Sequence, residues 1–497
     1  MSGRIISNIK VNYSAKLNAF PYQNEAFQAI KDLPYSAIFH EQGLGKTKIA
    51  IDLMLYWLTK KDIDTVMIVT KKQLVKNWEN EFALHTYIRP KILSQNKMDN
   101  FYVFNSPTKA IITNFETIST DKERLKLFLK CRNVAIIIDE STKLKNPKAK
   151  ITQDFFELSE LFKIRTIMTG TPVANRPYDI WSQVYFLDHG QSLGNNFDDF
   201  KKHTDLTNTL SQDVGNRTLF ENTVASIFDK IKTFSIRETK KNCNINLPNK
   251  EYRTINGQFS KKQKKIYDQI VRELCAEYKK DGNYIIEDES VTLKRLLRLN
   301  QITSNPRLID ESYDEISGKE IILEKLLQDI LKKNEKCIVW TNFIDNIEYF
   351  EKKFRQYNPC KIHGSMTIEQ RNRSVDIFKN DSECMIMFAT PQAAKEGLTL
   401  TVANHVIFYD RGFNLDDYLQ AQDRIHRISQ KKTCYIYNLM LDDSIDYWIN
   451  ALLDAKQNAA FLAQGDLNIK EYKNIMDYSY GDIIKGILKI NGGENYE

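Results

Sequence analysis

The stretch YSAIFHEQGLGKT, residues 35–47, decides the fold. It begins as an apolar segment suited to a strand and continues through Gly43 and Gly45 to Lys46 and Thr47, after which apolar spacing typical of a helix follows. A strand, a glycine loop and a helix in this order predict a phosphate-binding loop, where backbone N–H groups and the helix N-terminus face the anion. Lys46 is expected to reach the terminal phosphates of a nucleotide, and the Thr47 hydroxyl is expected to hold Mg²⁺.

The loop departs from the full pattern G-x-x-x-x-G-K-[ST], because His40 stands where the first glycine belongs. The shorter string that remains arises by chance in roughly one chain of this length in fifty. A nucleotide site therefore needs support from other segments of the chain.

A second element ends the apolar segment 134–138 with Asp139 and Glu140. Carboxylates that follow a strand beside a phosphate loop are where a nucleotide hydrolase holds Mg²⁺ and polarises the attacking water. Asp139 fits the first role and Glu140 the second. Taken alone, the pair is equally compatible with ordinary acidic residues in a turn.

Two further elements carry side chains that suit the same chemistry. Thr169, Gly170 and Thr171 follow an apolar segment, and their hydroxyls can sense the γ-phosphate and couple its presence to the rest of the protein. Arg424 and Arg427 are three residues apart, so on a helix they share a face and can direct two guanidinium groups at phosphates. By themselves, the first element is also typical of a plain turn and the second of a surface helix.

Short β-branched segments alternate with longer helix-like stretches, and this alternation occurs twice. It predicts an α/β fold with two parallel-sheet lobes in tandem and helical insertions between them. The predicted strands are residues 35–39, 65–69, 110–113, 134–138 and 166–168, then 337–340, 361–363, 384–388, 405–409 and 434–438. The predicted domains are an N-terminal ATP-binding lobe at 1–194, helical insertions and a basic linker at 195–316, a C-terminal lobe at 317–445, and a helix and tail at 446–497.

Composition excludes several classes of protein. The chain has 497 residues, of which 42% are hydrophobic and 27% charged, as in ordinary globular proteins of more than one domain. Its apolar runs are far shorter than the roughly 18 to 20 residues of a membrane span, and its N-terminus lacks the apolar stretch of a secretory signal. Seven cysteines without C-x-x-C spacing predict reduced thiols and no zinc site. We therefore expect no membrane partner and a cytoplasmic protein of a bacterial cell or virus-infected host, or a nuclear one in a eukaryote.

Positive charge is concentrated between Lys230 and Lys265, where 11 Lys or Arg face 2 Asp or Glu, a local balance of 11 − 2 = +9. The whole chain carries only +7. Such a segment can neutralise nucleic-acid phosphates, and it is equally typical of a solvated lysine-rich face.

Taken in order, these elements resemble the motifs of helicase superfamily two, and their spelling is similar to that of its Swi/Snf branch of ATPases. The resemblance covers residues 17–430. It is carried by Phe20-Pro21-Tyr22-Gln23, similar to the adenine-reading glutamine motif; 41–47, similar to D-E-M-G-L-G-K-T; 137–146, similar to D-E-G-H-x-L-K-N; 168–175, similar to L-T-G-T-P-x-x-N; 234–248, similar to the linker between lobes; 390–403, similar to the fifth motif; and 423–430, D-R-I-H-R-I-S-Q, nearly the family's D-R-x-H-R-I-G-Q. Within the branch, residues 397–400 and 175–177 look most like the annealing-helicase group.

The resemblance implies two RecA-like lobes that use ATP and Mg²⁺, and it assigns roles by position. The catalytic residues it implies are Lys46, Glu140, Arg424 and Arg427, and the residues that contact ATP are Tyr22, Gln23, Gly43, Gly45, Lys46 and Thr47. The implied Mg²⁺ ligands are Thr47 and Asp139, and the implied coupling residues are Thr169, Gly170, Thr171 and Gly397. The implied nucleic-acid contacts are Lys71, Thr113, Asn114, Gly364, Ser365 and Thr390. Ser141 and Thr142 replace the family's glycine and histidine after the acidic pair, which concerns coupling more than chemistry.

Three functional hypotheses follow from these residues and the resemblance. The first is a monomeric motor that couples ATP hydrolysis to movement along double-stranded or branched DNA and remodels or reanneals it. The second is a strand-separating DNA or RNA helicase, which shares every catalytic residue with the first. The third is a binding or scaffold protein that has lost hydrolysis, which the presence of Lys46, Asp139 and Glu140 disfavours.

Overall fold

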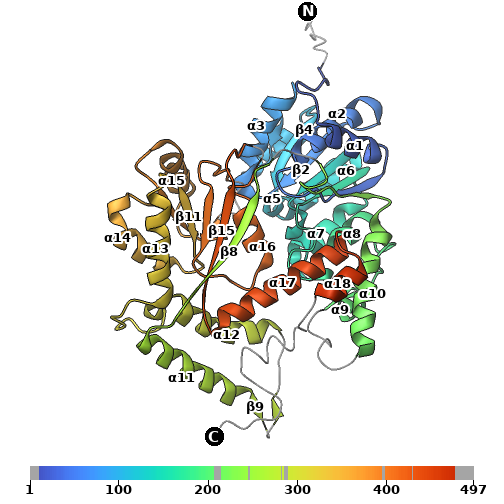
Figure 1. Cartoon of the computed structure of the whole chain (residues 1–497). Helices are drawn as coiled ribbons and strands as arrows, with labels where there is room; N and C mark the ends of the chain where they lie inside the picture. Colours follow the sequence, from blue (N-terminus) through green and yellow to red (C-terminus); the bar gives the residue numbers. More distant parts are fainter. Residues whose placement is uncertain are drawn as a thin grey trace, which may run out of the picture. The chain divides into compact units, whose positions relative to one another are not determined.

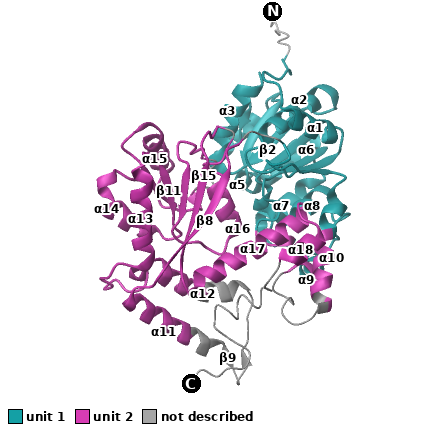
Figure 2. Cartoon of the chain, in the orientation of Figure 1, with its two compact units in different colours: residues 1–174, 178–202, 226–244 teal, residues 175–177, 203–225, 245–497 magenta. Residues whose placement is uncertain are grey.

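The computed structural model describes residues 11–205, 214–243, 247–280, 283–284, 289–393, 398–427 and 429–475. The chain divides into two compact units, which Figure 2 colours separately. Unit 1 comprises residues 1–174, 178–202 and 226–244, and unit 2 comprises residues 175–177, 203–225 and 245–497.

Unit 1 is built on a parallel sheet with the strand order β3-β4-β2-β5-β6-β1-β7. Its strands are β1 (Tyr35–Ile38), β2 (Thr65–Thr70), β3 (Lys91–Ile92), β4 (Ala110–Asn114), β5 (Val134–Asp139), β6 (Ile164–Met168) and β7 (Ser235–Ile236). The central strands β2 and β5 are continuous runs of buried, mostly β-branched residues, as expected where helices cover both faces of a sheet.

The helices of unit 1 pack their apolar faces on this sheet. They are α1 (Pro21–Ile30), α2 (Lys46–Lys60), α3 (Val75–His85), α4 (Lys97–Phe104), α5 (Phe115–Thr120), α6 (Lys122–Cys131), α7 (Lys150–Ser159) and α8 (Trp181–Asp188). Trp57 of α2 and Trp78 and Phe82 of α3 are almost fully buried in a cluster with strand residues such as Ile68 and Ile137. Helices α9 (Phe197–Thr204) and α10 (Val214–Ile231) each contribute residues to both units.

Unit 2 is built on a second parallel sheet with the order β12-β13-β11-β14-β15-β8. Its strands are β8 (Lys250–Gly257), β11 (Cys337–Trp340), β12 (Cys360–Ile362), β13 (Ile386–Ala389), β14 (His405–Phe408) and β15 (Cys434–Leu441). The accompanying helices are α11 (Lys261–Tyr278), α12 (Glu289–Ser304), α13 (Gly318–Leu331), α14 (Ile344–Lys353), α15 (Ile368–Asn380), α16 (Leu415–Gln422), α17 (Ile445–Gln464) and α18 (Ile469–Ile475), and a short antiparallel pair joins β9 (Lys279–Lys280) to β10 (Asn283–Tyr284). Figure 1 shows the strands of each sheet lying side by side among these helices.

A buried ion pair fixes the start of α13 in unit 2. The Lys319 ammonium lies 2.6 Å from an Asp446 carboxylate oxygen, and both side chains are almost fully buried. The other Asp446 oxygen accepts from the Leu441 N–H and the Ser444 hydroxyl. Because a buried charge is costly without such partners, this network ties α13 to the turn between β15 and α17.

The predicted class, α/β with two parallel-sheet lobes, is confirmed. Each of the ten predicted strands overlaps an observed strand of the expected sheet. The segment 195–316, expected to hold helical insertions, also supplies β7 to the edge of the first sheet and β8 to the edge of the second. Among the described residues, no helix combines the length and apolar character needed to cross a membrane.

Candidate active site

The phosphate-binding loop of unit 1 lies between β1 and α2, as predicted. Gly43 and Gly45 have φ angles of +86° and +69°, in the left-handed region that a side chain disfavours. Gly45 is the N-cap of α2, so Lys46 begins the helix and Thr47 follows it in the first turn. The Lys46 ammonium donates to the carbonyl oxygens of His40, at 2.8 Å, and Glu41, at 3.2 Å, so it lies folded over the loop that would receive phosphates.

The side chains of Tyr22 and Gln23 reach the same loop from α1. The Tyr22 hydroxyl and the Gln23 amide nitrogen both donate to the Leu44 carbonyl, at 3.1 and 3.2 Å. A Cβ on Gly45 would come within 2.3 Å of the Gln23 amide nitrogen, so only glycine permits this approach. The predicted ATP-binding residues of the first motif and of the loop are therefore in direct contact.

His40, the residue that replaces the first glycine of the loop, is a buried neutral side chain. Burial, and then the nearby charge of Lys46, lower the pKa of His40 to about 4. Its ring lies 6.4 Å from the Tyr22 ring, measured between centroids. The substitution therefore adds an uncharged ring beneath the loop and places no extra cation there at neutral pH.

The two carboxylates lie at the end of β5, Asp139 as its last residue and Glu140 just after it, at the same edge of the sheet as the phosphate loop. Ile38, Met168 and Asp139 are paired in register across β1, β6 and β5, so the loops after these three strands emerge together. One Asp139 oxygen accepts from the Trp78 indole N–H at 2.8 Å and from the Thr70 hydroxyl at 3.3 Å. We did not foresee these two donors from the sequence; the only signal for Thr70 was its place at the end of β2, on the same sheet edge.

Three charged side chains, those of Asp139, Glu140 and Lys71, lie close together at this edge of the sheet. Burial, and then the neighbouring charge of Glu140, raise the pKa of Asp139 to about 6. One Glu140 oxygen lies 3.7 Å from the Lys71 ammonium and is buried without a hydrogen-bond partner. Lys71, predicted as a nucleic-acid contact, thus lies beside the predicted catalytic carboxylate.

The segment Thr169-Gly170-Thr171 after β6 packs directly on the phosphate loop. A Cβ on Gly170 would come within 2.6 Å of the Gln42 side chain and 3.1 Å of its backbone nitrogen. Within the turn, the Thr171 N–H donates to the Thr169 hydroxyl at 3.2 Å, and both threonines are buried. The structure therefore brings the predicted coupling residues of unit 1 against Gln42, which directly precedes Gly43 in the phosphate loop.

The donor set at this edge fits Mg²⁺. The Thr47 hydroxyl and the Asp139 carboxylate are hard oxygen donors, and Mg²⁺ typically binds through one or two such groups together with substrate phosphates. Among the described residues, no group of three or more His, Cys, Asp or Glu could hold a metal by itself.

The two arginines of unit 2 are placed differently from our prediction. Helix α16 ends at Gln422, so Arg424 and Arg427 lie in the irregular segment after it and do not share a helix face. The Gln430 amide nitrogen donates to the carbonyl oxygens of Thr401, Ala403 and Ile425, which holds this segment in a non-helical path. The Arg424 side chain is buried, whereas the Arg427 guanidinium donates to the Thr399 hydroxyl at 2.6 Å.

The predicted nucleic-acid contacts of unit 1 other than Lys71 have side chains that are buried or hydrogen-bonded within the unit. Thr113 is buried in β4, and the Asn114 side chain accepts from the Thr117 N–H as the N-cap of α5. Contacts from this loop to a ligand would therefore fall to its backbone.

In unit 2, the loop after β12 presents Gly364 and Ser365 at the surface. The Ser365 hydroxyl is 2.8 Å from His363 Nδ1, and the Arg371 guanidinium donates to the Gly364 carbonyl at 2.7 Å. Thr390, after β13, is buried. Gly397, predicted as a coupling residue, lies outside the described residues.

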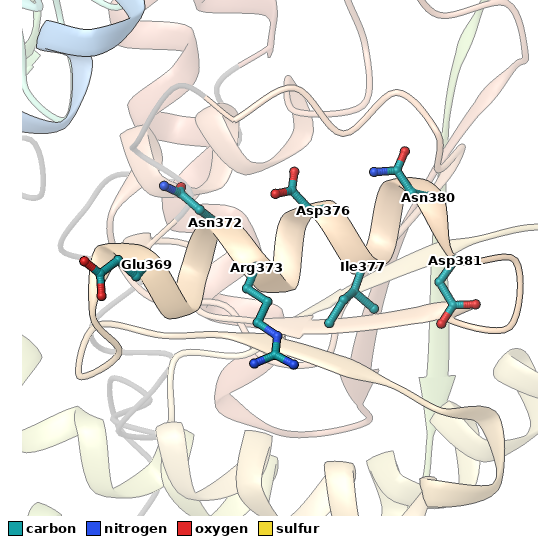
Figure 3. A pocket seen from close by; sticks show the side chains of 7 residues that line it. All are labelled: Glu369, Asn372, Arg373, Asp376, Ile377, Asn380 and Asp381. Carbon is teal, nitrogen blue, oxygen red and sulfur yellow. The ribbon is translucent and has the colours of Figure 1, made fainter.

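A pocket elsewhere in unit 2 lies along α15 and holds none of the predicted site residues. Figure 3 shows the side chains that line it, which project from this helix and, in the case of Asp381, from the residue that follows it: Glu369, Asn372, Arg373, Asp376, Ile377, Asn380 and Asp381. The candidate site therefore rests on the loops at the carboxyl edges of the strands.

Two family models match the chain. The model of the SNF2-related domain matches residues 34–308, and that of the helicase conserved C-terminal domain matches residues 318–429. A protein of Homo sapiens, SWI/SNF-related matrix-associated actin-dependent regulator of chromatin subfamily A member 1, is 27% identical over 451 residues, which cover 86% of this chain and 42% of that protein. The ATP-dependent DNA helicase DDM1 of Arabidopsis thaliana is 25% identical over 477 residues, covering 89% and 61%.

A solved structure described as the Sulfolobus solfataricus SWI2/SNF2 ATPase core in complex with dsDNA is similar at 23% identity and a TM-score of 0.41, covering 94% of this chain and 98% of that one. The chain spans less than two thirds of the length of the two relatives above.

Proposed function

The chain belongs to the SNF2-related family of helicase-like ATPases, and from this premise we propose that it is a DNA translocase that couples ATP hydrolysis to movement along double-stranded or branched DNA. The observation that carries the proposal is the meeting of three segments at one sheet edge of unit 1. The phosphate loop with Lys46, the carboxylates Asp139 and Glu140, and the turn around Gly170 all contact one another there or share a strand register.

Each residue at this sheet edge is proposed to have a separate role in phosphoryl transfer. Lys46 leaves its two carbonyl partners to bind the β- and γ-phosphates, and the N–H groups around Gly43 and Gly45 bind the same anion. Thr47 and Asp139 would hold Mg²⁺, which supplies charge neutralisation on the phosphates when bound. Glu140 orients the attacking water and accepts its proton.

The buried oxygen of Glu140 that lacks a hydrogen-bond partner supports this role. A carboxylate oxygen without a hydrogen-bond partner is costly in a protein interior and persists where a ligand completes it. The Lys71 ammonium lies 3.7 Å from this oxygen, so the carboxylate is held beside a cation at the sheet edge. Arg424 and Arg427 of unit 2 are proposed to act on the γ-phosphate as supplementary cations, as in other phosphoryl-transfer enzymes.

DNA is proposed to be bound through its phosphates and without sequence preference. The proposed contacts lie at the carboxyl edges of the two sheets: Lys71 after β2, Thr113 and Asn114 at the end of β4, Gly364 and Ser365 after β12, and Thr390 after β13. The relatives' names, a regulator of chromatin and a DNA helicase, favour DNA over RNA. Remodelling or reannealing of branched DNA would be the output of such a motor, and the protein is proposed to act as a monomer.

The decisive experiment separates translocation from strand separation. The purified protein and ATP are given a triplex, with a third strand in the major groove, and a tailed duplex of similar length. We expect release of the third strand from an intact duplex, because a motor that tracks phosphates along one strand displaces obstacles without opening base pairs. The Glu140→Gln protein serves as the control without hydrolysis. Unwinding of the tailed duplex without third-strand release would instead establish a strand-separating helicase.

The basic segment at the start of α11 gives a second test of the DNA interface. Lys262 and Lys264 are paired with Asp314 and Asp268, whereas Lys261 and Lys265 are exposed on one helix face. If this face meets DNA phosphates, changing Lys261 and Lys265 to Glu will weaken DNA binding. Each lost contact will lower the slope of log K against log salt by about 0.9.

The measurement is duplex binding by fluorescence anisotropy over a range of salt concentrations. The control changes two exposed lysines outside the basic window to Glu, Lys325 on α13 and Lys332 at the C-cap of that helix, which alters the net charge equally. An unchanged slope in the α11 variant, or an equal change in both, would identify the run as a solvated face.

A further inference from the structure

A buried amide on α8 connects two of the segments that make the active site. Gln183 is completely buried, and its amide oxygen accepts from the Ser141 hydroxyl at 2.8 Å. Its amide nitrogen donates to the carbonyl oxygens of Pro172 and Asp179, both at 2.8 Å. One acceptor and both donors of the side chain are thus used inside the protein.

The partners of Gln183 directly adjoin the proposed catalytic and coupling residues. Ser141 follows Glu140, and Pro172 follows Thr171. The turn around Gly170 in its turn packs on Gln42 of the phosphate loop. One side chain therefore fixes the distance between the turn that carries Glu140 and the turn that contacts the nucleotide loop.

The backbone at Glu140 needs such support. Its φ and ψ angles are 56° and 50°, in the left-handed region, where a residue with a Cβ pays a conformational cost. Such conformations persist only when surrounding contacts hold them, and they concentrate at functional sites. The Ser141 hydrogen bond to Gln183 acts on the residue immediately after the strained one.

The Ser141–Gln183 contact also accounts for a departure noted in the sequence. The family spelling D-E-G-H places glycine where this chain has Ser141, and glycine has no side chain to donate. A buried serine and a buried glutamine are each costly unless they are paired, so each compensates for the other.

We infer that Gln183 is a positioning residue for ATP hydrolysis, which holds Glu140 at the reacting water through Ser141 and links it to the Thr169–Pro172 turn. The inference rests on the proposed role of Glu140. It assigns Gln183 no contact with the nucleotide, so its loss acts on turnover and leaves nucleotide affinity in place.

The test uses Gln183→Met, which keeps the length of the side chain and removes its hydrogen bonds. DNA-saturated ATP turnover is measured together with the KM for ATP and the melting temperature. We expect kcat to fall about tenfold, the lower end of the effect of residues that orient a catalytic group, with KM within about twofold of the wild-type value. Ser141→Ala should lower kcat less, and the double variant should be no slower than Gln183→Met alone, because both changes break the same link.

A control variant separates positioning from general destabilisation. Thr65→Val removes a buried hydroxyl that donates to the Thr108 carbonyl at 2.8 Å, at the opposite end of β2, and should leave kcat unchanged. If Gln183→Met does not fold, Ser141→Ala alone carries the test through its kcat. Wild-type turnover in folded Gln183→Met, additive losses in the double variant, or a kcat loss equal to that of Thr65→Val would overturn the inference.

Including Glu140→Gln distinguishes this inference from the proposed function. An inactive Glu140→Gln beside a fully active Gln183→Met would refute the positioning role alone. A fully active Glu140→Gln would refute the proposed base and the positioning role with it.

Discussion

Replacing Glu140 with glutamine is expected to stop ATP turnover while leaving nucleotide binding nearly intact. The amide keeps the shape of the side chain but cannot accept the proton of the attacking water, and general-base catalysis contributes about 10² to 10⁴ in rate. Glutamine also removes the negative charge that faces the Lys71 ammonium. We expect ATP binding to tolerate this loss, because the Glu140 charge is not required to hold the triphosphate. The measurements are DNA-stimulated phosphate release and binding of a fluorescent ATP analogue.

Two further variants serve as comparisons for Glu140→Gln. Lys46→Ala should lose both turnover and affinity, because it removes the ammonium proposed to bind the β- and γ-phosphates. Glu116→Gln, on α5 of the same unit and about half-exposed, should behave like the wild type. Phosphate release by Glu140→Gln at the wild-type rate would show that another group is the base.

Replacing Arg427 with alanine is expected to slow hydrolysis by about 10³ to 10⁵, the range observed for arginines that stabilise the charge of a phosphoryl-transfer transition state. The affinity for ATP should change far less, since the effect arises as charge develops on the transferred group. The hydrogen bond to the Thr399 hydroxyl already orients the Arg427 guanidinium. The side chain therefore loses less conformational entropy when it binds a phosphate. Single-turnover hydrolysis and nucleotide binding measure the two quantities separately.

Arg424→Ala should have a smaller effect on hydrolysis, and because its side chain is buried it should also lower the melting temperature. Arg373→Ala, an exposed residue of α15 shown in Figure 3, is the matched control that removes one arginine from the surface of unit 2. Equal losses of ATP affinity and turnover in Arg427→Ala would indicate that this arginine contacts the ground state.

The parts of the fold that could be predicted from the sequence are those with a local hydrophobic signal. Strands β2 and β5 are unbroken apolar runs because both faces are covered, and such runs stand out in a sequence. Strand β8 is an edge strand with mostly exposed, polar side chains, so it carries no apolar run and fell within a segment expected to be helical. Its pairing with β15 is a long-range contact, and the local sequence of β8 does not predict it.

The site shows the same division between local and long-range information. Lys46, Asp139 and Glu140 could be predicted because glycine spacing and a strand end identify them within a few residues. The helix predicted for Arg424 and Arg427 was wrong, since carbonyl partners of Gln430 from distant loops override the local helical spacing. Trp78 and Gln183 contact the acidic turn from other helices, and no spacing in the sequence links them to it.

The proton affinity of Asp139 implies a trade-off between stability and function. In the folded protein its carboxyl holds a proton up to about pH 6, against 3.8 for an ordinary aspartic acid. Because the folded state binds the proton more tightly than the unfolded state does, the contribution of this group to stability declines as pH rises from about 3.8 to 6, and the cost persists at neutral pH. The buried charge of Asp139 thus lowers the stability of unit 1 at neutral pH, and Lys46 and Lys71 offset only part of this cost. Binding of the nucleotide should therefore also raise the stability of unit 1, because a ligand that binds only the folded state stabilises it.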